Sequence, residues 1–122
     1  MATADALRRY VPAEHRVVEL APEDRRERIA AAAGGQQAAV EGPTLFVITG
    51  VVARTVAKYG DRAERYVQLE AGHVCQNLLL EATALGLGAV PMGAFSDEAL
   101  RAALDLGEGE LPLYVVPVGY PI

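Results

Sequence analysis

The chain has 122 residues and a formal net charge of −5, with 52% hydrophobic residues and no tryptophan. A chain of this length forms one domain, residues 1–122, and its high apolar content predicts that it buries surface against a partner as well as within itself. Its ten arginines are spread among sixteen acidic residues, so no basic patch of the kind that binds nucleic acid is visible.

The sequence also argues against a membrane-spanning protein, because its longest apolar runs are short and are broken by Gly, Pro and polar residues. The first ten residues, MATADALRRY, contain no apolar signal core. The single cysteine, Cys75, cannot form an internal disulfide. We therefore predict a cytoplasmic protein.

The first half of the chain predicts short strands alternating with helices. Pro22 suits the first turn of a helix, Glu23 and Asp24 suit the positive end of its dipole, and Gly34-Gly35 end it. The run TLFVITGVV is too continuous in its apolar character for a half-exposed strand and is typical of a buried one. The expected elements are a strand at 16–20, a helix at 22–33, a further helical turn at 36–40, a buried strand at 44–52 and a polar stretch at 53–66.

The second half is dominated by a long helix, expected at about 62–85. A loop at 89–95 follows it, and Ser96 then caps a helix at 97–106. The last strand, 111–122, contains Pro112 and Pro117, which predict an edge position or a bulge. Together these elements predict a mixed α+β layer. One buried stripe of the long helix recurs at steps of three and four: Val67, Ala71, Val74, Leu78, Ala82 and Leu85.

Common chemical motifs are absent. The sequence has no GxxxxGK[ST] phosphate loop, no strand-linked GxGxxG, no GxSxG turn, and neither HExxH nor CxxC. Its only metal-ligating His and Cys residues are His15, His73 and Cys75. His73 and Cys75 are two apart on a helix and point to different faces, so we expect a buried histidine and a core cysteine rather than a metal site.

Two stretches remain as candidates for chemistry. Lys58, the only lysine, stands beside Tyr59, and this pair can serve as general acid or base if burial shifts either pKa. The alternative is a solvated helix end with ordinary ion pairs. In residues 90–95, small side chains let a flat ligand approach backbone N–H groups, and the alternative is a tight connection. The charged run at 23–28 is interpreted as a solvated face.

The stretch RYVQLEAGHVCQNLLLEATALGLGAVPMGAFSDEALRAAL, followed by PLYVVPVGYP, closely resembles the nitroreductase-like flavoproteins. Within that family the chain is most similar to the C-terminal part of the SagB-type dehydrogenases, which form azoles in peptides. LRRYVPAEHRVVEL resembles a hairpin of the family, and KYGDRAERY resembles its Lys-Tyr region. The resemblance covers nearly the whole chain and implies an incomplete α+β nitroreductase-like fold, with a mixed sheet and a long, buried central helix.

This resemblance implies roles for particular residues. The loop after the long helix lies against the flavin ring in the family, with backbone groups near N5 and O4, and those positions match Pro91, Met92, Gly93 and Ala94. FMN is the implied cofactor. The Lys-Tyr pair of azole-forming members matches Lys58 and Tyr59, which are then expected to act as the base for the proton removed from substrate. The helix is expected to form the centre of a dimer core.

The sequence departs from the family in what grips the FMN phosphate. No arginine- and serine-containing phosphate motif is present, and Tyr120 stands where many relatives have Arg or Lys. The chain is therefore expected to be a half-site subunit, completed by a homodimer or by a separate chain, with a small-molecule or peptide substrate. The alternative is a non-catalytic scaffold or binding protein that has lost the flavin, and a plainer one is a truncated gene product.

Overall fold

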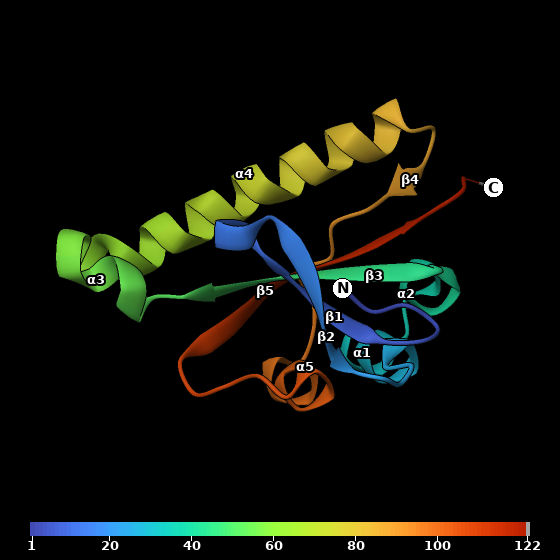
Figure 1. Cartoon of the computed structure of the whole chain (residues 1–122), viewed down its shortest axis with the longest axis horizontal. Coiled ribbons are helices and arrows are strands. Elements are labelled where there is room, and N and C mark those ends of the chain that lie inside the picture. Colours follow the sequence, from blue (N-terminus) through green and yellow to red (C-terminus); the bar gives the residue numbers. More distant parts are fainter. Residues whose placement is uncertain (122) are drawn as a thin grey trace.

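The computed structural model describes residues 1–121. The chain forms two strands of a hairpin, a three-stranded sheet and five α-helices (Figure 1). Their bounds are β1 (Leu7–Val11), β2 (Arg16–Ala21), α1 (Arg26–Ala32), α2 (Gln37–Glu41), β3 (Thr44–Val51), α3 (Ala53–Tyr59), α4 (Ala63–Ala84), β4 (Gly88–Ala89), α5 (Asp97–Leu104) and β5 (Glu110–Gly119), with 3-10 turns at Pro12–Glu14 and Gly60–Arg62.

The three-stranded sheet is the middle layer of the molecule. Its order is β3-β5-β4, and both pairings are antiparallel. The long helix α4 crosses one face and contacts all three strands, whereas α1 and α5 pack together under the other face (Figure 1). The mixed α+β architecture with a long central helix is therefore confirmed.

Each face of the sheet has its own core. On the α1–α5 side, the largest fully buried side chains are Ile29, Leu45, Leu100 and Val115. On the α4 side, Val116 and Cys75 are buried among partly exposed residues of β3, β5 and α4. Alternation along β3 explains this division, because Leu45 and Val47 point to one face and Phe46 and Ile48 to the other.

The position of β5 corrects the sequence-based expectation of an edge strand. β5 is central, with β3 on one side and β4 on the other. Both prolines lie where the ladder tolerates them. The register shifts beside Pro112, where Leu113 has no partner on β3, so a bulge is present as expected. The Pro117 carbonyl accepts a hydrogen bond from the Val90 amide on the β4 side. The position where Pro117 lacks an N–H therefore also faces β4, which pairs with only part of β5.

Helix α1 is shorter than expected and starts at Arg26, not at Pro22. Glu23 and Asp24 do not act as free charges at its N-terminus, because they form ion pairs with Arg25 and Arg26. Arg25 is only 8% exposed. Its guanidinium donates to the Ala103 carbonyl at 3.1 Å and to the carboxylate of Asp105, and that second bond raises the arginine pKa. The interpretation of 23–28 as a solvated face is therefore wrong at Arg25, which connects α1 to the end of α5.

Helix α4 buries one side only within this chain. Ala71, Cys75 and Ala82 are buried, and burial raises the pKa of the Cys75 thiol. Val74 and Leu85, which were expected in the buried stripe, are 53% and 64% exposed. The prediction that these two residues are buried was wrong, because the sheet contacts only a narrow face of α4 and small residues occupy that face. His73 is exposed rather than buried.

The exposed surface of α4 carries large apolar side chains among polar ones. Leu69 and Leu80 are 52% and 60% exposed, in addition to Val74 and Leu85. Exposed large apolar side chains of this kind are typical of an interaction surface. None of the helices in residues 1–121 is long and apolar enough to cross a membrane.

Candidate functional site

The loop at 91–94 is fixed to the centre of the sheet by one residue. Met92 is 5% exposed, and its backbone exchanges two hydrogen bonds with Val115 of β5, at 2.8 and 3.0 Å. The Ser96 amide then donates to the Ala32 carbonyl at 2.8 Å, and the Ser96 side chain caps α5. The loop is therefore held at both ends by the sheet and by α1.

Between these two anchors, the backbone is open. Pro91, Gly93 and Ala94 are exposed, and within residues 1–121 the N–H groups of Gly93 and Ala94 have no hydrogen-bond partner. A Cβ placed on Gly93 meets no atom within 4 Å. Of the four positions expected to contact a ligand, Pro91 has no N–H and the N–H of Met92 is used by Val115. Gly93 and Ala94 are thus the two positions that offer donors to a flat ligand.

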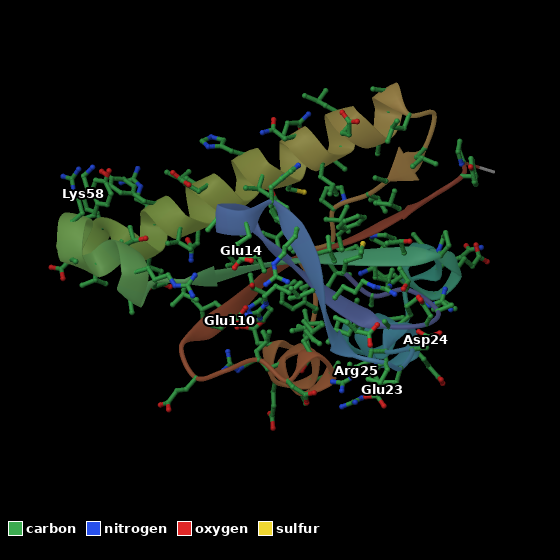
Figure 2. All side chains as sticks on the ribbon, viewed as in Figure 1. Glu14, Glu23, Asp24, Arg25, Lys58 and Glu110 are labelled. Atoms are coloured by element: carbon green, nitrogen blue, oxygen red, sulfur yellow. The ribbon has the colours of Figure 1, made fainter. Side chains whose placement is uncertain are left out.

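Lys58 and Tyr59 end helix α3, just before the start of α4 (Figure 2). The Lys58 Nζ lies 5.2 Å from the centroid of the Tyr59 ring. The Tyr59 ring packs edge-to-face on Tyr66 of α4, with centroids 4.9 Å apart. Both members of the pair are exposed, so the geometry within one chain also fits the alternative of a solvated helix end.

Tyr59 borders a hollow of about 400 Å³ between α3, α4 and the end of β3. Arg54, Tyr66 and Glu70 also line it. Residues 91–94 line neither this hollow nor the larger one described below. Neither of these two hollows therefore brings the Lys58-Tyr59 pair and the 91–94 loop together.

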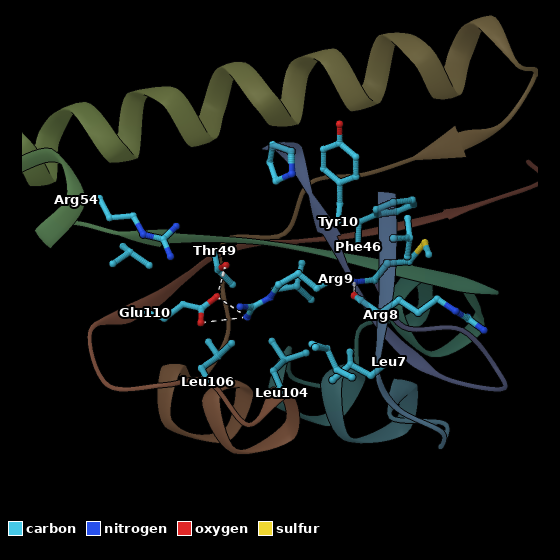
Figure 3. A pocket seen from close by; sticks show the side chains of 16 residues that line it. Leu7, Arg8, Arg9, Tyr10, Phe46, Thr49, Arg54, Leu104, Leu106 and Glu110 are labelled. Atoms are coloured by element: carbon cyan, nitrogen blue, oxygen red, sulfur yellow. Dashed lines mark hydrogen bonds and ion pairs between the residues drawn. The ribbon is translucent and has the colours of Figure 1, made fainter. Parts of the chain in front are cut away.

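The larger hollow, of about 490 Å³, lies between the β1–β2 hairpin and β3 (Figure 3). Glu110, only 9% exposed, lies at its base. The Glu110 carboxylate accepts hydrogen bonds from Arg9 of the hairpin and from the Thr49 hydroxyl of β3. Sequence reasoning missed this cluster, because three residues so far apart in the chain show no common motif.

The other charges around the larger hollow are mostly paired. Arg8 donates to Asp5, and this hydrogen bond holds the pKa of the Asp5 carboxyl well below its usual range. Arg54 lines both hollows, and no ion pair to it is found within residues 1–121. The described residues contain no group of three side chains suited to hold a metal ion.

The residues of this chain suit the ring of a flavin better than its phosphate. The 91–94 loop offers open backbone donors for a ring. A dianionic phosphate needs charged donors, but Tyr120, which follows β5, is uncharged and 86% exposed. Arg26 reaches the carbonyl of Pro43, which packs against Gly119 at this end of the sheet, but its other hydrogen bonds go to Asp24. At this end of the sheet, Tyr120 therefore offers no charge and Arg26 is already paired with Asp24.

Known structures share the fold of this chain. The chain superposes on a nitroreductase structure from Anabaena variabilis with a TM-score of 0.85 and 27% identity, covering 94% of this chain and 24% of that one. A nitroreductase structure from Ralstonia eutropha gives a TM-score of 0.83 and 25% identity, with 99% and 56% covered. The NADPH:FMN oxidoreductase of Vibrio harveyi gives a TM-score of 0.68 and 25% identity, with 80% and 46% covered.

Sequence comparison agrees with the structural one. The provisionally named nitroreductase MJ1384 of Methanocaldococcus jannaschii is 41% identical over 114 residues, which are 93% of this chain and 57% of that protein. The chain thus spans little more than half the length of this relative. The model of the nitroreductase family matches residues 2–120. This chain therefore belongs to the nitroreductase family.

Proposed function

We propose that this protein is an FMN-dependent oxidoreductase of the nitroreductase type, most similar to SagB-type dehydrogenases, and that it forms only part of its flavin site. The observation that carries the proposal is the pair of unpartnered N–H groups at Gly93 and Ala94, on a loop fixed to the sheet through Met92. Family membership and the likeness to an NADPH:FMN oxidoreductase support the choice of ligand.

In this proposal each candidate residue has a separate task. Met92 anchors the loop, Pro91 shapes it, and the amides of Gly93 and Ala94 donate to the ring. FMN, when bound, supplies the two-electron chemistry that side chains cannot perform. Lys58 and Tyr59 hold or move the proton that accompanies it, since a lysine or tyrosine near a reacting atom acts as acid or base once its pKa is shifted.

The proposal requires a second chain. The 91–94 loop and the Lys58-Tyr59 pair lie in different parts of one chain, so a partner copy is needed to bring one of each together. The exposed surface of α4 is the part we assign to this dimer, because four of its large apolar side chains are about half or more exposed. The phosphate contact comes from the same partner or from a further chain.

A second candidate function follows from the phosphate side. Because Arg26 at that end of the sheet is already paired with Asp24, the chain also fits a non-catalytic scaffold that keeps the dimer core and binds a peptide, a protein or another small ligand. This alternative predicts the same fold and the same α4 surface, but no affinity for FMN.

The loop itself provides the test. Gly93→Pro removes one of the two open donors, and Met92 before it is already extended, as a residue preceding proline prefers. Gly107→Pro is the matched control, since it lies in another exposed loop and its amide also has no partner within residues 1–121. We expect FMN affinity, measured by flavin fluorescence titration, to fall at least about tenfold for Gly93→Pro only. Equal affinity in both variants contradicts the assigned ring contact, and no affinity in the parent chain even when a completing chain is present favours the scaffold.

A further inference from the structure

The smaller hollow, of about 400 Å³, is lined by two opposite charges that have no partner within residues 1–121. Arg54 lines it from α3 and Glu70 lines it from α4. Neither side chain forms a hydrogen bond or an ion pair with any described residue, and the two are not paired with each other. The hollow therefore presents a free guanidinium and a free carboxylate.

Aromatic and apolar side chains form much of the remaining wall. Tyr66 packs edge-to-face on Tyr59, and both side chains line the hollow. Val67 of α4 and Leu113 of β5 line it as well. These two pack closely over Gly50, because a Cβ at Gly50 falls 2.5 Å from Val67 and 3.0 Å from Leu113. This part of the wall therefore suits an apolar or aromatic group of a ligand.

The size and charges of the hollow limit what it can bind. Its volume is at the lower end of the range for small-molecule pockets, which is roughly 300–1,000 Å³. A ligand with a single charge pairs with Arg54 or with Glu70 and covers the other group without pairing it, which is costly. A ligand with both a carboxylate and an ammonium group pairs with both.

We infer that the smaller hollow binds a small zwitterion of the α-amino-acid class with an apolar or aromatic side chain. The ligand's carboxylate pairs with Arg54, and its ammonium group pairs with Glu70. Its side chain packs against the Tyr59–Tyr66 pair. Arg54 fixes the orientation, because a guanidinium binds a carboxylate through two parallel hydrogen bonds. The inference goes beyond the proposed function, since it requires neither a flavin nor a second chain.

Arg54 also lines the larger hollow (Figure 3), but that hollow suits a zwitterion less well. Among the described residues that line it, only Glu110 is acidic. The Glu110 carboxylate already accepts hydrogen bonds from Arg9 and Thr49. Because Glu70 is free and Glu110 is not, the ligand is assigned to the smaller hollow.

The experiment titrates L-phenylalanine into the isotopically labelled chain and follows the NMR spectrum. We expect saturable binding, with nuclear Overhauser effects from the phenyl ring to the methyl groups of Val67 and Leu113, which line only the smaller hollow. Phenethylamine lacks the carboxylate and 3-phenylpropionate lacks the ammonium group. We expect each of these two analogues to bind at least about tenfold more weakly than phenylalanine, because each loses one charged partner.

Substitutions at the two charges have different expected effects on the analogues. Arg54→Gln weakens the binding of phenylalanine at least about tenfold and leaves that of phenethylamine unchanged. Glu70→Gln also weakens the binding of phenylalanine but leaves that of 3-phenylpropionate unchanged. Arg65→Gln and Glu81→Gln are the matched controls, because both residues are exposed on α4, form no ion pair within residues 1–121 and line neither hollow. An unchanged spectrum away from the hollow shows that each variant folds.

Three results overturn the inference. The first is the absence of saturation by phenylalanine at roughly 10 mM. The second is equal affinity for phenylalanine and both analogues, because the two charges then select nothing. The third is contact of the phenyl ring with Leu104 and Leu106, which line only the larger hollow.

FMN retention reports separately on the proposed function. A chain that binds phenylalanine but never retains FMN, even with a completing chain, supports the zwitterion site and contradicts the flavin site. A chain that retains FMN but does not bind phenylalanine leaves the proposed function standing and overturns this inference.

Discussion

One guanidinium nitrogen of Arg9, in the hairpin, donates hydrogen bonds to both carboxylate oxygens of Glu110, at 2.9 and 3.1 Å. The two residues are 101 positions apart in the sequence. The Thr49 hydroxyl donates to the same carboxylate at 2.7 Å. A carboxylate with a side chain 12% exposed is costly to bury unless it is paired and hydrogen-bonded. This cluster therefore does more than fill a cavity: it fixes the β1–β2 hairpin over β3 and β5 and so shapes the larger hollow.

The first prediction concerns this cluster. Glu110→Gln removes the charge but keeps the size, and we expect it to lower the free energy of unfolding by about 1–2 kcal/mol. We expect a small loss of stability because the Arg9 side chain is 47% exposed and water screens the ion pair. Urea denaturation measures it, with Glu108→Gln, an exposed residue of the preceding turn, as the control. Equal stability of the two variants contradicts a role for Glu110 in fixing the hairpin.

The contact of α4 with the sheet gives a second prediction. A Cβ on Gly50 of β3 falls 2.5 Å from Cγ1 of Val67 and 3.0 Å from Cδ1 of Leu113. Valine in a helix has little rotamer freedom, so Gly50→Ala is expected to destabilise the fold by about 1–3 kcal/mol. Gly72→Ala, within α4 and with no atom near its Cβ, is expected to stabilise by about 0.5–1 kcal/mol. Thermal denaturation distinguishes these opposite signs.

A dimer through α4 is the third prediction. Leu80 is 60% exposed on the outer side of the helix, and Leu80→Arg places a charge in the proposed interface. We expect the dimer dissociation constant to rise at least about tenfold, as measured by analytical ultracentrifugation. Val40→Arg on α2, where Val40 is 63% exposed, is the control. A parent chain that stays monomeric at all concentrations contradicts the dimer directly.

Much of the fold was accessible from the sequence because local signals agreed with tertiary packing. Ser96 followed by Asp97 and Glu98 predicted the start of α5, and Ser96 accepts a hydrogen bond from Ala99 there. The central position of β5 could not be predicted from the sequence. A proline lacks an N–H on one side of the strand only, and the sequence does not show which side is paired. The register shift at Leu113 and the short β4 resolve that ambiguity in the structure.

Only part of the candidate site could be predicted from the sequence. Small residues at Gly93 and Ala94 indicated a backbone-presenting loop, but only the structure distinguishes their open amides from that of Met92, which Val115 uses. The Arg9–Thr49–Glu110 cluster and the two hollows depend on contacts distant in sequence. No pattern along the chain carries that information. The proximity of Lys58 to Tyr59 was visible in the sequence, whereas its separation from the 91–94 loop was not.

The fourth prediction concerns the Lys58-Tyr59 pair. If these residues move the proton, Lys58→Ala and Tyr59→Phe lower turnover of a nitroaromatic or azoline substrate by about 10²–10⁴-fold in the flavin-loaded protein. FMN affinity stays unchanged, because neither residue touches the ring donors in this account. Tyr120→Phe and Arg65→Ala, both exposed, are the matched controls. Full activity in the Lys58 and Tyr59 variants assigns the pair to a solvated helix end.

The most direct measurement is the visible absorption spectrum of the purified chain after incubation with excess FMN and desalting. It is recorded for the chain alone and for the chain mixed with the remainder of the M. jannaschii relative, outside the region that this chain matches. The account predicts a retained flavin band, of about one FMN per chain, in at least one of the two samples. Complete release of FMN from both samples contradicts the flavin half-site and favours a scaffold that has lost its cofactor.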